Sequence, residues 1–424
     1  MGTLPTIPEW VQMEHQVAQI LTQQELHGWY FDEQKARELE STLRRELEDT
    51  TRLLREQFPY VAGALFTPKR DNRTQGYVDG AQLQRLKEFN PTSRDQIAWI
   101  LQTHFDWTPK ESQKTPTGKP IIDEIILKEI NSPFSMHCLK LLDLTKKLGM
   151  ISEGVNAWLK LCTSVKRIHH HCSVATITHR CAHRKPNLAQ VPSDERFREL
   201  FTASPSMVMV GADLSGIELR MLAHYLARYD EGRYANILLT GDIHQVNADK
   251  IGVNSRQVKT ITYAMIYGAG NKKLGASFDA SLSEETAERK GREIRKAFIE
   301  AIPGLADLLK GVKQAAERGY VKSIDGRHIS VDKAHQALNY LLQSGAGVLA
   351  KYWMVLAHFA TSPHKDTHQL AFVHDELQYE TTPDYVEDLK YLLEFTAKQA
   401  GEYYKLRIPI AAEAKAGSNW AEVH

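Results

Sequence analysis

The sequence predicts an α+β protein in which the first 150 residues are mostly helical and short strands lie in the remainder. Three observations support this fold class. Residues 10–57 carry apolar side chains at helical spacing. Met207–Val210 is a short apolar run of strand length, and apolar residues at helical spacing follow it. Segments 323–330 and 368–380 each contain β-forming residues on either side of a turn, which predicts two pairs of short strands.

The composition is that of an ordinary globular chain. Its 424 residues suffice for two or three structural units, and its 42% hydrophobic and 25% charged residues are average values. The formal net charge is +1, so any binding of nucleic acid must depend on local clusters of basic residues. No apolar run approaches the roughly 20 residues that span a bilayer, and no signal-peptide pattern is present. The four cysteines favour free thiols in a reducing compartment, so we expect a cytoplasmic protein that does not bind membranes.

The N-terminal part combines helices with loops. Segment 33–57 is predicted to be a helix whose alternating Glu and Arg residues suit a solvated face, although contact with a phosphate backbone is an alternative. Residues 59–80 hold Pro, Gly, Asn and Asp with little periodicity, so we expect a loop there and another at 108–120. Further helices are predicted at 122–130 and 134–162.

A segment rich in His and Cys, residues 168–183, raises the question of a zinc site. His169, His170, His171 and Cys172 are contiguous, however, and this spacing does not match a CxxC or HxxxH ligand pattern. We therefore do not expect zinc to bind there.

Asp213 lies where the apolar strand gives way to a helix. A carboxylate behind an apolar run costs desolvation energy unless a charged partner compensates it. A metal ion is one such partner, and a helix-capping role is the simpler alternative. Asp375 has a similar setting at the tip of an apolar hairpin and is followed by Glu376. If two strand-end carboxylates meet across a sheet, they can hold two divalent ions for phosphoryl transfer, and Mg²⁺ suits such ligands.

The helix predicted from about Ser255 has two distinct faces. At about 100° per residue, two cations and two aromatic residues form one stripe, whereas Val258, Ile261 and Met265 lie on the opposite face. Arginine and lysine side chains suit a polyphosphate, and aromatic rings provide surfaces on which bases stack. An ordinary amphipathic helix is the alternative interpretation. The stripe consists of Arg256, Lys259, Tyr263 and Tyr267.

These segments, taken together, resemble family A (Pol I-type) DNA polymerases. Asp213–Arg220 resembles motif A, Arg256–Gly268 resembles motif B, and Val373–Glu376 resembles motif C. The wider similarity is to the replicative polymerases of short-tailed phages, and it extends over nearly the whole chain, more loosely before residue 150. The other matching segments are Thr178–Arg180 with Pro186–Gln190, Gly241–His244, Asn339–Gln343 and the ending Ser418–His424.

The resemblance implies a right-hand polymerase fold, with an antiparallel-sheet palm, helical fingers and a helical thumb. The expected parts are an N-terminal palm-associated segment at 1–30, the thumb at 31–150, the first part of the palm with motif A at 151–235, the fingers with motif B at 236–330, and the second part of the palm with motif C at 331–424. The implied function is template-directed addition of dNTPs to a primer 3′-OH with release of pyrophosphate.

The resemblance also assigns roles to individual residues. Asp213, Asp375 and Lys259 would be catalytic, and Asp213, Asp375 and the Leu214 carbonyl would hold two Mg²⁺ ions, for which Mn²⁺ can substitute. Glu218 would exclude a ribose 2′-OH. A Tyr at position 263 implies poor rejection of dideoxynucleotides. The nucleotide-binding set is Glu218, His244, Arg256, Lys259 and Tyr263, and the DNA-binding set is Arg180, Gln190, Tyr267, Asn339, Gln343 and His374.

Three departures from the family pattern stand out. The arginine that usually lies four residues before the motif B lysine is replaced by Ser255, and Arg256 lies three residues before it. His179 stands where glycine is usual in the Thr-Gly-Arg element, which raises a question about the backbone next to Arg180. The segment between Gln57 and Phe89 is shorter than in phage relatives that recruit host thioredoxin through a thumb insertion, so we expect no thioredoxin dependence.

The resemblance suggests the protein's partners as well. The chain begins where the polymerase domain begins and no acidic exonuclease motif precedes residue 150, so we expect no 3′–5′ exonuclease domain in it. Primer–template DNA and dNTPs are the expected partners of a monomeric enzyme in the cytoplasm, of the host if a phage encodes it. A separate exonuclease subunit and a helicase–primase are further candidates. The alternatives are a single-subunit RNA polymerase-like enzyme and a non-catalytic DNA-binding relative.

Overall fold

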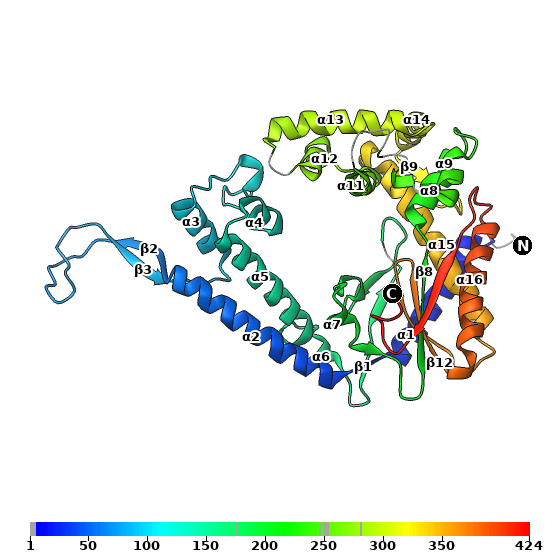
Figure 1. The fold of residues 1–424 in the computed structure, drawn as a ribbon, viewed down its shortest axis with the longest axis horizontal. Helices are drawn as coiled ribbons and strands as arrows, with labels where there is room; N and C mark the ends of the chain where they lie inside the picture. The colour runs from blue at the N-terminus through cyan, green and yellow to red at the C-terminus, as the bar shows by residue number, and fades with distance from the viewer. Residues whose placement is uncertain (1–5, 175, 242, 246–247, 249–253, 280–281) are drawn as a thin grey trace, which may run out of the picture. The chain divides into compact units, whose positions relative to one another are not determined.

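The computed structural model describes residues 6–174, 176–241, 243–245, 248, 254–279 and 282–424. The chain forms two compact units (Figure 1). The larger unit combines Met1–Glu33 with Leu161–His424, and the smaller unit is Gln34–Lys160. In the described part of the chain, no helix combines the length and the apolar composition that a membrane crossing requires.

A four-stranded antiparallel sheet is the centre of the larger unit. Its strand order is β11 (His368–Val373), β12 (Glu376–Thr381), β8 (Val208–Leu214) and β13 (Ala412–Gly417). Every residue of β12 is buried, because this inner strand is covered on both faces. The register places Glu376 directly opposite Asp213, so the start of β12 meets the end of β8.

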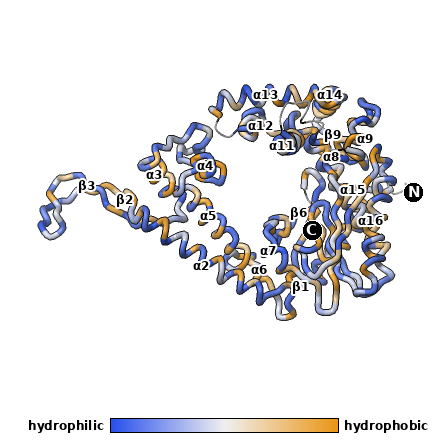
Figure 2. The backbone as a smooth tube through the Cα atoms, in the orientation of Figure 1, coloured by the Kyte–Doolittle hydropathy of each residue, from blue (hydrophilic) through white to orange (hydrophobic). Residues whose placement is uncertain are grey.

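The sheet packs with helices that come from both ends of the chain (Figure 1). The main one is α15 (Ala337–Thr361), which is buried on most sides and contacts α1 (Glu9–His27), α8 (Ile217–Leu226) and α16 (Val386–Tyr403). Trp353 on α15 donates its indole N–H to the Leu393 carbonyl of α16 at 2.9 Å. In Figure 2, α15 is accordingly more hydrophobic than the solvated α2 (Glu33–Gln57).

The larger unit also contains a group of helices around motif B. Glycines at 275 and 291 allow two of these helices, α12 and α13, to pack backbone against backbone, since a Cβ at either position would collide with a carbonyl of the other helix. The Asp-Gly turn is confirmed, with Gly326 at φ +82° between β9 (Tyr320–Lys322) and β10 (His328–Ser330). The helices are α9 (Arg233–Thr240), α11 (Ser255–Ile266), α12 (Asn271–Phe278), α13 (Glu284–Ala301) and α14 (Leu305–Ala316).

Short strands lie next to the N-terminal helix α1. β1 (Trp29–Phe31) lies between β4 (Arg167–Ile168) and β7 (Phe201–Thr202), and β5 (His171–Ser173) pairs with β6 (Ala182–Arg184). A short helix, α7 (Glu195–Arg198), precedes β7. Side chains of the consecutive histidines tie this region to its neighbours. His171 Nδ1 lies 2.8 Å from Glu25 of α1, and His170 Nε2 lies 2.7 Å from the Leu370 carbonyl of β11.

The smaller unit is largely helical but contains a strand pair where we expected a loop. β2 (Tyr60–Phe66) pairs with β3 (Leu83–Glu88), so the loop predicted at 59–80 is wrong for its first part. The partner of β2 lies beyond that segment, which is why periodicity within the segment did not indicate a strand. The helices are α2, α3 (Arg94–His104), α4 (Glu124–Ile130), α5 (Pro133–Leu148) and α6 (Trp158–Leu161).

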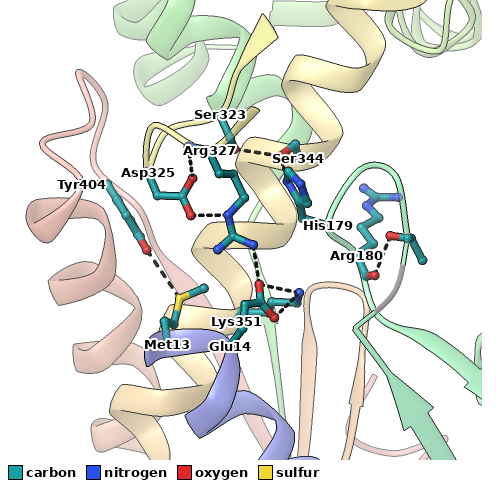
Figure 3. A network of polar contacts seen from close by, with 11 residues as sticks. Met13, Glu14, His179, Arg180, Ser323, Asp325, Arg327, Ser344, Lys351 and Tyr404 are labelled. Atoms are coloured by element: carbon teal, nitrogen blue, oxygen red, sulfur yellow. Dashed lines mark hydrogen bonds and ion pairs between the residues drawn. The ribbon is translucent and has the colours of Figure 1, made fainter. Parts of the chain in front are cut away.

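A buried ion-pair network joins α1, α15 and the β9–β10 hairpin (Figure 3). Glu14 accepts from Lys351 Nζ at 2.9 Å and from Arg327 Nη1 at 2.5 Å. Arg327 Nε also donates to Asp325 at 2.6 Å. Two cations thus face two carboxylates, so the network is balanced although Lys351 is only 1% exposed. Buried ions persist only when they are paired in this way.

Replacing Glu14 with Gln tests this network. The change leaves Lys351 without a carboxylate and Arg327 with one fewer, so we expect unfolding free energy to fall by about 3–5 kcal/mol, as for other broken buried pairs. Denaturant unfolding followed by circular dichroism measures the loss. Glu300→Gln in the exposed Lys296–Glu300 pair of α13 is the control and should cost less than about 1 kcal/mol. Equal losses in the two variants would contradict a structural role for the network.

The buried carboxylate of Glu380 in β12 should make the unfolding free energy depend on pH. Burial alone would raise the pKa of Glu380, but hydrogen bonds from His27 and Ser204 outweigh burial and lower it to about 2. A depressed pKa means that the carboxylate stabilises the fold fully above the unfolded value of about 4.3 and loses this contribution as pH falls toward 2. We therefore expect the stability difference between the parent protein and Glu380→Gln to shrink by about 3 kcal/mol across that range. If the unfolding free energies of the parent and of Glu380→Gln changed with pH in parallel, the stabilising role of the Glu380 carboxylate would be wrong.

Candidate active site

Strand pairing brings the two candidate carboxylates together. Asp213 is the penultimate residue of β8, and Asp375 lies in the turn before β12. The backbone N–H of Leu214 donates to the Asp375 carbonyl at 3.1 Å, next to the cross-strand pair of Asp213 and Glu376. Residues far apart in the sequence therefore meet at one end of the sheet, where β8 ends and β12 begins. We call this end the sheet edge.

Asp213 does not cap the following helix. The residue before α8 is Gly216, with φ +57°, and within the described residues α8 has no side-chain capping hydrogen bond. Glycine suits this left-handed position because it has no Cβ. Ile217 and Met221 bury the inner face of α8 in the core. The capping interpretation of Asp213 is therefore wrong. Asp213 is exposed as a residue at the end of the strand, but its surroundings partly desolvate its carboxyl group.

Negative charge accumulates at this edge. Burial raises the pKa of Asp375 to about 7, and the charges of Asp213 and Glu218 add to the effect. Desolvation raises the pKa of Asp213 to about 6, and Glu376 and Glu218 contribute further. Both carboxyl groups resist ionisation because anionic neighbours surround them in a desolvated position. A cation bound between them would relieve this repulsion.

The edge fits a divalent ion that binds together with a substrate. Among the residues that the structure describes, no three His, Cys, Asp or Glu side chains are arranged to hold a metal by themselves. Mg²⁺ is commonly bound by one or two carboxylates plus substrate phosphates. Two adjacent carboxyl groups with raised pKa meet that requirement.

Glu218 lies where three segments meet. Its Oε1 accepts from Arg180 Nη2 at 3.1 Å and from the Tyr267 hydroxyl at 3.2 Å. The rings of Tyr263 and Tyr267 are stacked, with centroids 6.4 Å apart and planes 22° apart. Desolvation and the charge of Glu218 raise the pKa of Tyr267 to about 12, which keeps its hydroxyl protonated as a donor. Motif A, the motif B helix and the Arg180 segment therefore converge on one carboxylate.

The motif B helix presents the part of the predicted stripe that the structure describes. α11 begins after Asn254, whose side chain forms a capping box with Gln257. Val258 and Ile261 are buried, while Lys259 is exposed on the other face. The side chain of Arg256 lies outside the described residues. In the Gly241–His244 motif, Asp242 is also outside them, and His244 is half-buried in a short helical stretch.

The structure places the remaining predicted DNA contacts in different environments. Gln190 is exposed, and so is His374, which occupies the β11–β12 turn at φ +60°. Gln343 is half-buried on α15. Asn339 is buried and donates its amide to the Ile266 carbonyl at the end of α11 at 3.2 Å. Contact of these four residues with DNA stays a prediction.

Glu376 belongs to the site although we did not select it from the sequence. It is buried and accepts from Trp420 Nε1 at 2.5 Å and from Gln378, and His424 Nδ1 lies 3.1 Å away. The last residues of the chain thus surround a carboxylate that faces Asp213. Two features of the sequence could have pointed to Glu376: the Asp375-Glu376 pair of acidic residues and the ending Ser418–His424.

Comparisons with a family model and with curated proteins give one consistent result. The model of DNA polymerase family A matches residues 71–422. The chain is 29% identical over 502 residues to the DNA-directed DNA polymerase of Enterobacteria phage T3, covering 98% of this chain and 70% of that protein. The corresponding enzyme of Escherichia phage T7 is 29% identical over 505 residues, with the same coverage.

A solved structure has the same fold. The POL domain of Pol1 from M. smegmatis, in complex with a DNA primer-template and dNTP, superposes with a TM-score of 0.78 at 22% identity, covering 97% of this chain and 70% of that one. The predicted right-hand α+β fold is thereby confirmed. Because the family model matches most of the residues, including the segments that carry Asp213 and Asp375, the chain belongs to DNA polymerase family A.

Proposed function

We propose that this chain extends DNA primers at the edge formed by β8 and β12, where Asp213, Asp375 and the Leu214 carbonyl hold two Mg²⁺ ions that Mn²⁺ can replace. Family A polymerases generally use divalent metal ions. The observation that carries the proposal is the β8–β12 register, which brings two carboxyl groups of raised pKa side by side. When bound, the ions supply charge stabilisation for the attacking 3′-OH and the leaving pyrophosphate.

The motif B helix supplies the triphosphate contacts in this proposal. Lys259 is exposed on the face of α11 that carries Tyr263, so its ammonium is available to a polyanion. Arg256 and His244 are the further proposed phosphate ligands. The stacked rings of Tyr263 and Tyr267 provide an aromatic surface beside the sugar and the templating base.

Glu218 is the proposed selector of the sugar. Arg180 and Tyr267 hold its carboxylate, so it occupies a defined position between motif A and the motif B helix. A carboxylate fixed in this way would exclude a ribose 2′-OH by its volume. Burial raises the pKa of Tyr263, and the charges of Glu218 and Asp375 contribute.

The proposed partners are primer–template DNA and dNTPs, as named for the M. smegmatis complex. Arg180, Gln190, Tyr267, Asn339, Gln343 and His374 are the proposed DNA contacts. The smaller unit, residues 34–160, covers most of the segment that we assign to the thumb. Independence from thioredoxin, a monomeric state, a cytoplasmic location, and cooperation with a separate exonuclease and a helicase–primase are part of the same proposal. An RNA polymerase-like activity is disfavoured by the family match.

Asp375→Asn tests the metal-binding proposal. We expect primer extension with Mg²⁺ and dNTPs to fall by about 10³-fold or more, because the loss of a metal ligand removes several kcal/mol of transition-state stabilisation. Extension of a labelled primer under single-turnover conditions measures the rate. Glu387→Gln, which removes an exposed carboxylate of α16, is the control. Undiminished extension by Asp375→Asn would refute the site, and equal use of NTPs by the parent would refute DNA synthesis as its specific activity.

Tyr263→Phe tests the assignment beside the sugar. In the parent, the tyrosine hydroxyl is expected to replace the missing 3′-OH of a dideoxynucleotide. Without it, discrimination against ddNTPs should rise roughly tenfold or more, since a hydrogen bond to a charged group contributes about 1.5–3 kcal/mol. The measurement is the ratio of kcat/KM for dNTP and ddNTP. Tyr229→Phe, at an exposed tyrosine, is the matched control, and equal ratios in the two variants would contradict the assignment.

A further inference from the structure

His179 occupies a backbone conformation that disfavours side chains. Its φ is +60°, in the left-handed region where glycine is favoured because a Cβ crowds the backbone. The family pattern has glycine at this position, so the histidine is the more strained choice. Surrounding contacts must therefore hold the segment in this conformation.

The imidazole of His179 is anchored on α15 (Figure 3). Its Nδ1 lies 2.7 Å from the Ser344 hydroxyl, which lies 2.7 Å from the Ser323 hydroxyl at the start of the β9–β10 turn. Both serines are buried, so the hydrogen bonds are shielded from water. The backbone N–H of His179 donates to the Thr176 carbonyl at 3.1 Å, which closes the turn.

The imidazole is neutral in this position. Burial lowers the pKa of His179 to about 4, and the positive charges of Arg327 and Lys351 contribute. A neutral imidazole can form a hydrogen bond with a hydroxyl without placing another charge next to the ion-pair network. The anchor is therefore compatible with the buried cations beside it.

The backbone that follows His179 fits closely against α15. A Cβ at Gly347, one turn beyond Ser344, would lie 3.2 Å from Arg180 Cγ and 3.3 Å from the His179 carbonyl oxygen. The Thr176 hydroxyl donates to the Arg180 carbonyl at 2.6 Å. The imidazole anchor and this close contact together fix where the Arg180 side chain starts.

Arg180 connects this anchor to Glu218. Its guanidinium donates to Glu218 at 3.1 Å, and the two side chains are only 19% and 16% exposed. The same carboxylate oxygen accepts from Tyr267. A shift of the His179 turn would therefore change the position of Arg180 and, through it, the orientation of Glu218.

We propose that His179 is a positioning residue for sugar selection: its hydrogen bond to Ser344 fixes the left-handed turn that places Arg180 against Glu218. His179 itself contacts neither DNA nor nucleotide in this role. The inference rests on the proposed role of Glu218 as the group that excludes ribose. It explains how a histidine serves where the family has glycine, because the side chain adds an anchor that glycine lacks.

Three variants separate strain from anchoring. His179→Gly relieves the strain but removes the anchor, and Ser344→Ala removes the anchor from the other side. His179→Asn tolerates the left-handed region and keeps a hydrogen-bonding side chain. Single-nucleotide incorporation gives kcat/KM for dNTP and rNTP. We expect the dNTP/rNTP ratio to fall roughly tenfold in His179→Gly and in Ser344→Ala, and less in His179→Asn, because contacting residues are energetically coupled. Thermal unfolding of each variant reports its stability separately.

The Glu218→Ala background identifies the route of the effect. There, His179→Gly should cause no further change in the ratio, because the group that it positions is gone. A ratio within about twofold of the parent in both His179→Gly and Ser344→Ala, or an equal fall with and without Glu218, would overturn the role of His179. If Glu218→Ala alone keeps the parent ratio, the sugar-selection role of Glu218 is wrong and this inference falls with it.

Discussion

The antiparallel pairing of β8 with β12 is the constraint on which the active site depends. A register in which Glu376 faces Asp213 puts Asp375 beside Leu214 and gathers three carboxyl groups at one sheet edge. Burial raises the pKa values of Asp213 and Asp375, and repulsion from neighbouring carboxylates adds to the effect, so this arrangement costs stability in the absence of a cation. The buried, fully paired strand β12 supplies the rigidity that keeps them together.

Helix α15 links this edge to the rest of the larger unit. Near its middle, α15 buries Lys351 against Glu14 of the N-terminal helix. Further along, Ser344 holds the His179 turn, and Asn339 binds the end of the motif B helix. Segments separated by hundreds of residues therefore take their positions from one buried element. A packed helix suits this purpose because its side chains cannot move independently of the core.

Much of the secondary structure and the exposure of Lys259 could be predicted from local patterns. The strands around Asp375, the Asp-Gly turn and the exposed Lys259 follow from periodicity and turn chemistry. Strand β2 escaped prediction because its partner lies outside the window in which periodicity was judged. Glu376 escaped selection because its importance comes from residues near the C-terminus, which only folding brings to it.

The sequence by itself determined the family, the order of its motifs and the chemical types at each position, because these are properties of neighbouring residues. Only the tertiary structure decided that Asp213, near the end of β8, lies beside Asp375 and does not cap α8. It also decided that His179, unusual as a residue type, is anchored to Ser344 next to the Arg180–Glu218 pair. The reason is that strand register and side-chain contacts between distant segments depend on the packing of the whole core.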